Sequence, residues 1–161
     1  MNVGRNLLRS VFAVALVAMA GWAQGEVATP YPGTRVIPTP HSYAQMVERL
    51  PAAVKSNKMG VVARASATLG ARKIGVTIAG NMVVGVFHPR FAVRMLAASV
   101  PAGIEAPLRF YITENADGTA TLTYRLPSSV FAPYQSKALD AMAAELDSIF
   151  ARIAQEATAS N

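Results

Sequence analysis

The chain has 161 residues and no cysteine, and its 15 basic and 9 acidic residues give a formal net charge of +6. This length is enough for one domain with a hydrophobic core. The absence of cysteine excludes disulfide bonds, thiolate metal sites, a cysteine nucleophile, covalent c-type haem and a lipoprotein anchor.

Residues 1–25 have the features of a secretory signal peptide. Arg5 and Arg9 form a basic start, residues 11–22 are apolar, and residues 23–25 include small side chains that suit a cleavage site. A membrane anchor is the less favoured alternative, because the apolar run is shorter than the about 20 residues that a spanning helix needs. We therefore expect a cleaved Sec-type signal, a periplasmic or secreted protein, and no stable membrane span after processing.

Prolines at 30, 32, 38 and 40 predict that residues 26–40 form an extended lead-in, followed by a single domain over residues 41–158. Residues 35–125 hold eleven basic and four acidic residues, so the body of the chain is basic. A basic surface favours anionic partners. Because export argues against nucleic acid, the remaining candidates are a small anionic ligand, an acidic protein, the membrane surface, or a charge that serves solubility alone.

Helix and strand signals alternate between residues 42 and 101. Ser42 and Gln45 form a capping box, and Pro51 should kink or restart the helix that begins there. The run at 81–87 is apolar on both faces, which is typical of a strand inside a sheet. The expected elements are a helix from Ser42, a strand over 61–65, a weak helix over 67–74, a strand over 81–87 and a short helix from Pro89.

A β-hairpin is predicted over about residues 107–126, where two runs of β-branched and aromatic residues flank a turn cluster. A two-residue turn would set Ile112 opposite Thr123, an apolar side chain against a polar one. A three-residue loop with Gly118 in the left-handed conformation sets Ile112 opposite Leu122 and keeps one face apolar. The other face then carries three pairs: Arg109 opposite Arg125, Tyr111 opposite Thr123, and Thr113 opposite Thr121.

A long helix is predicted from Lys137, after a loop over residues 128–135 that contains Pro133. Ser136 is a suitable N-cap. The chain is therefore expected to be an α+β two-layer sandwich, in which an antiparallel-rich sheet is covered by helices, including this long C-terminal one. One stripe of that helix should face the sheet: Leu139, Met142, Ala143, Leu146, Ile149, Phe150 and Ile153.

No catalytic constellation is visible. The phosphate-loop, dinucleotide-binding and nucleophile-elbow motifs are absent. His41 and His88 have no partner at metal-ligand spacing, and the methionines suit a core, so we expect no metal and no cofactor. Two alternatives to a binding protein stay open: an enzyme with a site near His88, Tyr124 and Tyr134, and a haem or metal carrier.

Four stretches carry a family resemblance: ATLGARKIG, an apolar strand ending in VFHP, RMLAA, and AGIEAPLRFYITENADGTATLTYRLP. Together they resemble the DUF302 family, a bacterial domain of unknown function, over residues 42–157. The resemblance implies an α/β sandwich of the TATA-box-binding-protein-like class. No activity comes with the family, so no catalytic residue is carried over. The chain departs from many members at residues 87–90 and 124–127, which suggests a subgroup with its own ligand.

The pairing of Arg109 with Arg125 is the basis of the functional hypothesis, since like charges directly opposite are normally unfavourable. Guanidinium groups offer planar forks of donors that suit carboxylate, sulfate or phosphate. The alternative interpretation is that the side chains splay into water, or that Glu105 or Glu114 shields them. The predicted ligand-binding residues are Arg109, Arg125, His88, Arg90 and Tyr124.

Overall fold

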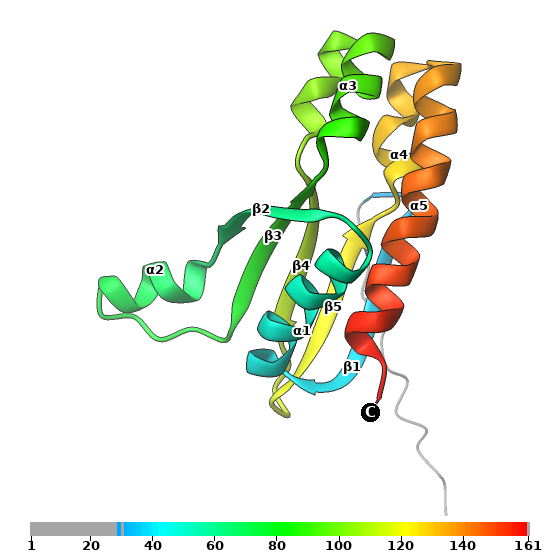
Figure 1. The fold of residues 1–161 in the computed structure, drawn as a ribbon. Helices are drawn as coiled ribbons and strands as arrows, with labels where there is room; N and C mark the ends of the chain where they lie inside the picture. The colour runs from blue at the N-terminus through cyan, green and yellow to red at the C-terminus, as the bar shows by residue number, and fades with distance from the viewer. Residues whose placement is uncertain (1–28, 30, 161) are drawn as a thin grey trace, which may run out of the picture.

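The structure, a computed structural model, describes residue 29 and residues 31–160 (Figure 1). The signal peptide predicted over residues 1–25 lies outside the described residues. A five-stranded antiparallel sheet, with strand order β1-β5-β4-β3-β2, forms one layer. Its strands are β1 (Thr34–Ser42), β2 (Gly60–Ala65), β3 (Asn81–Phe87), β4 (Leu108–Glu114) and β5 (Thr119–Arg125).

Helices form the second layer. The two longest pack side by side on one face of the sheet, whereas the third and fourth extend beyond its end and the second stands off to one side (Figure 1). The predicted α+β two-layer sandwich is therefore confirmed. The helices are α1 (Tyr43–Ser56), α2 (Ala67–Lys73), α3 (Pro89–Ala98), α4 (Pro127–Phe131) and α5 (Lys137–Thr158), with 3-10 turns η1 (Val100–Glu105) and η2 (Ala132–Tyr134).

The β4–β5 hairpin has the predicted register, with Ile112 opposite Leu122 and Phe110 opposite Tyr124. Its three-residue loop ends at Gly118, whose φ of 81° lies in the left-handed region. The Gly118 N–H donates to the Asn115 carbonyl oxygen at 3.0 Å, which closes the turn. Because side chains alternate between the two faces of a strand, this register places Phe110 and Tyr124 on one face and Arg109 and Arg125 on the other.

Aromatic stacking joins the sheet to α5. The ring of Phe150 stacks on that of Phe110, with centroids 4.7 Å apart and planes inclined by 13°, and both side chains are fully buried. The helix begins after its predicted N-cap, since the Ser136 hydroxyl accepts from the Leu139 N–H at 3.4 Å. All seven residues of the predicted apolar stripe are buried, so the face assigned to this helix is confirmed.

The predicted lead-in differs from what the structure shows. Its described part is extended, but from Thr34 onward it is strand β1, paired with β5 at the edge of the sheet. Prolines lack the N–H that a ladder needs, yet an edge strand has one side free of a ladder and tolerates them. Pro38 faces Thr121 in register, and Pro40 falls where the register shifts. The proline pattern therefore marks an edge strand.

Two further expectations about prolines were wrong in part. The segment predicted as a loop after the hairpin contains α4 and η2. Pro127 lies in the first turn of α4, where a proline's missing N–H loses no helical hydrogen bond. Helix α1 continues through Pro51 to Ser56 and does not restart. No helix among the described residues is long and apolar enough to span a membrane.

Candidate functional site

One face of the sheet is covered by α1 and α5. The opposite face, which we call the open face, carries the side chains that alternate along each strand with the buried ones. Arg109 is exposed there, and Tyr111 keeps 39 % of its surface accessible. Strand β3 supplies Val83 beside Tyr111 and Gly85 beside Arg109. The open face therefore presents cationic and apolar side chains next to each other.

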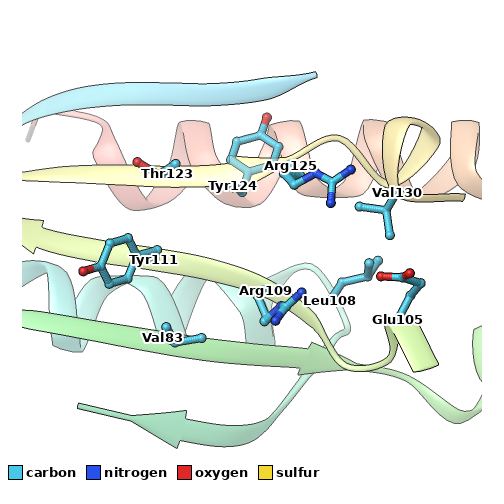
Figure 2. Close-up of a pocket in the computed structure, with 9 residues that line it drawn as sticks. All are labelled: Val83, Glu105, Leu108, Arg109, Tyr111, Thr123, Tyr124, Arg125 and Val130. Atoms are coloured by element: carbon cyan, nitrogen blue, oxygen red, sulfur yellow. The ribbon is translucent and has the colours of Figure 1, made fainter. Parts of the chain in front are cut away.

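A cavity of about 250 Å³ lies on this face where β5 ends and β4 begins. Figure 2 shows its wall, to which η1 and α4 contribute Glu105 and Val130 beyond the ends of the strands. The nine residues that line it are Val83, Glu105, Leu108, Arg109, Tyr111, Thr123, Tyr124, Arg125 and Val130.

Arg109 and Arg125 each lie one residue beyond the Phe110–Tyr124 pair, at which the β4–β5 ladder ends, and both line the cavity. The guanidinium carbon of Arg125 lies 4.9 Å from the centroid of the Tyr31 ring. The Arg125 Nε atom is buried and has no hydrogen-bond partner among the described residues. In that part of the chain, neither arginine has an ion pair within 4.0 Å. A buried donor without an acceptor is unfavourable, and an anion would supply the acceptor.

The two glutamates that could shield the arginines are engaged elsewhere. Glu114 accepts from the Gly80 N–H at 2.6 Å, and Glu105 accepts from the Tyr134 hydroxyl at 3.0 Å. Desolvation, and then the hydrogen bond and charge of Glu105, raise the pKa of Tyr134 above its usual value. The tyrosine therefore remains a proton donor to Glu105 at neutral pH. Among the described residues, the Glu105 carboxylate lines the same cavity as the two arginines, but no carboxylate lies within 4.0 Å of either guanidinium group.

Two other predicted site residues lie away from this cavity. His88 is the N-cap of α3, where its Nδ1 accepts from the Arg90 N–H at 3.1 Å, and it lines a small apolar pocket beneath that helix. The Arg90 guanidinium pairs with Glu145 of α5 at 3.1 Å. The expectation that these two residues lie at the edge of the arginine site does not agree with their position. The start of α3 turns toward α5 and away from the open face.

Tyr124 contributes to the cavity wall, but its ring belongs to the core. It is 6 % exposed, and its centroid lies 5.0 Å from that of Phe110 and 6.0 Å from that of Phe150. Burial raises the pKa of its hydroxyl. Of the residues named for the alternative enzyme site, Tyr124 lines the cavity of the open face, His88 lines the pocket beneath α3, and Tyr134 lines neither of these two pockets. The described residues contain no group of three or more histidine, aspartate or glutamate side chains that could hold a metal ion.

Sequence reasoning missed most of the cavity wall. The hairpin register puts Tyr111 on the same face as the arginines, and this signal could have identified it as a site residue, but the predicted set does not include it. Glu105 and Val130 reach the cavity from η1 and α4, and only tertiary packing brings those two turns together. No pattern in the sequence announces such contacts.

Comparison with known proteins gives one family and one fold. The model of the family described as "Domain of unknown function DUF302" matches residues 35–157, about three quarters of the chain. A crystal structure of an uncharacterized conserved protein DUF302 from Bacillus stearothermophilus is similar, with a TM-score of 0.69 and 19 % sequence identity. That match covers 78 % of this chain and 98 % of the other. The search of curated proteins gave no match.

Proposed function

Because this chain belongs to the DUF302 family, a domain of unknown function, we propose its function from the site itself: it binds a small anion between Arg109 and Arg125 without transforming it. The observation that carries the proposal is that two arginines line one cavity and that neither has an ion pair within 4.0 Å among the described residues. We also propose that the chain is exported by its N-terminal segment and meets this ligand in the periplasm or outside the cell.

The arrangement supports anion binding on physical grounds. Two neighbouring guanidinium groups repel each other, and an anion between them replaces that repulsion with charge-assisted hydrogen bonds. The Arg125 Nε atom is buried and has no partner, so its hydrogen-bonding capacity is not used within the described chain. The cavity volume of about 250 Å³ lies just below the about 300–1,000 Å³ of ordinary ligand pockets. This size favours a small anion over an acidic protein.

The composition of the wall supports binding over catalysis. Among the nine described residues that line the cavity, Glu105 is the only one with a carboxyl group, and there is no histidine, serine or lysine. The wall has hydroxyl groups on Thr123, Tyr111 and Tyr124, but the hydrogen bond that Glu105 accepts comes from Tyr134, outside the wall, and not from any of them. Glu105 itself accepts a hydrogen bond from Tyr134, which holds its carboxylate in place.

Thermal denaturation with added anions tests the proposal. Sulfate or phosphate, compared with chloride at equal ionic strength, should raise the melting temperature by mass action. At ten times the dissociation constant the gain is about 1.4 kcal/mol, or roughly 4–7 °C for a domain of this size.

Three single variants make the test specific. Arg109→Ala and Arg125→Ala should abolish the response to sulfate. Arg35→Ala is the matched control, because Arg35 pairs in register with Tyr124 and therefore points to the opposite face of the sheet from Arg125. It removes the same charge and should leave the response intact. An equal response in all three variants, or no response in the unmodified protein, would refute anion binding at this site.

A further inference from the structure

The cavity of the open face continues past its arginines into a second, shallower hollow. Val83 and Tyr111 line both of them, so the two hollows adjoin, and we call them together the trough, which reaches from β5 and β4 to β3 and the start of α2. The remaining residues that line the second hollow are Ala65, Ser66, Ala67 and Asn81.

The shape of the trough is set by what lies beside Arg109. Its neighbour on β3 is Gly85, and a Cβ atom there would stand 2.9 Å from Cγ of Pro107, so the Pro107 ring covers this part of the sheet. The trough therefore cannot extend from Arg109 across the sheet to Gly85. It extends instead across the next pair of residues on the open face, where Tyr111 of β4 and Val83 of β3 are opposite each other.

The two ends of the trough differ in chemistry. One end holds the side chains of Arg109 and Arg125, whereas the exposed ring of Tyr111 and the side chain of Val83 lie where the two hollows meet (Figure 2). Arg109 and Tyr111 are two residues apart on one strand, a separation of about 7 Å at about 3.4 Å per residue. An inorganic anion would occupy the first end alone.

We infer that the ligand is an organic carboxylate with an apolar body, such as a short acyl chain or an arylalkyl group. Its carboxylate binds between Arg109 and Arg125, and its apolar part lies on Val83 and Tyr111. This inference rests on the proposed function and names the class of its ligand. The apolar contact distinguishes such a ligand from sulfate or phosphate.

A series of carboxylates of increasing length measures the apolar contact. Complete burial of a methylene group strengthens binding about fourfold, and a ligand in an open trough buries about half of its surface, so about twofold per methylene is expected. Hexanoate should therefore bind on the order of tenfold more tightly than acetate. The probes are acetate, butyrate and hexanoate, with uncharged hexanamide as the control, and the protein is expressed from the full-length chain. Apparent dissociation constants follow from the melting temperature at a series of ligand concentrations.

Variants assign the gain to the trough. Val83→Thr keeps the shape of the side chain and replaces a methyl group with a hydroxyl, and Tyr111→Ser removes the ring. Each should lower the hexanoate-to-acetate ratio, and because both ligands are compared within one variant, this ratio does not depend on an unchanged sulfate response. Tyr111→Phe keeps the ring and should keep the ratio. Val62→Thr is the matched control, because Val62 lies on β2, is 56 % exposed and does not line the trough.

The outcomes separate this inference from the proposed function. Equal affinity for acetate and hexanoate, with an intact sulfate response, overturns the inference and leaves anion binding standing. A chain-length gain that persists in Arg109→Ala, or that hexanamide reproduces, places the apolar contact elsewhere and also overturns it. Absence of any response, to sulfate as well as to the carboxylates, overturns both.

Discussion

Replacement of Phe150 by alanine tests whether α5 closes the core in the way the structure describes. The Phe150 side chain is fully buried, and its ring stacks on Phe110 at 4.7 Å. Loss of a fully buried phenylalanine costs about 3–5 kcal/mol. Stacked aromatic pairs contribute about 0.5–1.5 kcal/mol beyond their buried area, so the loss should lie in the upper part of that range. Phe150→Leu refills part of the volume and should cost clearly less.

Urea denaturation followed by circular dichroism measures the effect. The midpoint should fall while the slope with denaturant stays constant, because a constant slope means that the surface exposed on unfolding has not changed. Val93→Ala on α3 is the control, since Val93 is 69 % exposed and surface substitutions change stability by only about 0.5 kcal/mol. A loss below about 1 kcal/mol for Phe150→Ala would mean that this side chain does not pack against the sheet.

Three other predictions are independent of the ligand. Hydrogen bonds from Thr119 lower the pKa of Asp117 below its usual value of 3.8. The stability that this carboxylate gives the hairpin should therefore be present above pH 3.8 and be lost as the pH falls through the lower pKa of the folded state. Asp117→Asn should remove this acid-dependent part of the unfolding curve. Gly33→Ala should destabilise the fold by about 1–2 kcal/mol or more, because Gly33 has a φ of 74° and an added Cβ would overlap the Ser129 side chain; urea denaturation would show it, and an unchanged midpoint would contradict it. Mass spectrometry of exported protein should find an N-terminus near Glu26, whereas uncut protein in the membrane fraction would argue against a cleaved signal.

The hairpin and the long helix could be predicted because their signals are local and repeat. A shift of one residue in the hairpin would put Phe110 and Tyr124 on opposite faces of the sheet, so the apolar pattern alone selects the register. The same pattern places Arg109 next to Arg125. The central part of the candidate site therefore followed from sequence, because it is a consequence of core pairing and not of any functional motif.

The rest of the site could not be predicted, because it depends on the direction in which the chain leaves each strand. His88 follows β3 directly, and this position suggested the edge of the site. The strand order leaves open which face the next helix packs against, and α3 turns toward α5, where Arg90 finds Glu145. Glu105, in contrast, does line the cavity, although it lies in the turn η1, whose sequence has no apolar periodicity. The position of a residue just after a strand therefore does not predict on which face of the sheet its side chain lies.

The core, and not a ligand, holds the two arginines together. Unfavourable like-charge pairs on a sheet cost of the order of 0.2–1 kcal/mol, whereas the buried contacts of Phe150 with Phe110 are worth several times that amount. The register is therefore maintained without a ligand, and the proposed anion site is ordered in the free protein. A site that is already ordered loses little conformational freedom on binding. Weakening the core by Phe150→Ala should for this reason reduce the affinity for sulfate in the fraction that remains folded, although Phe150 does not line the cavity.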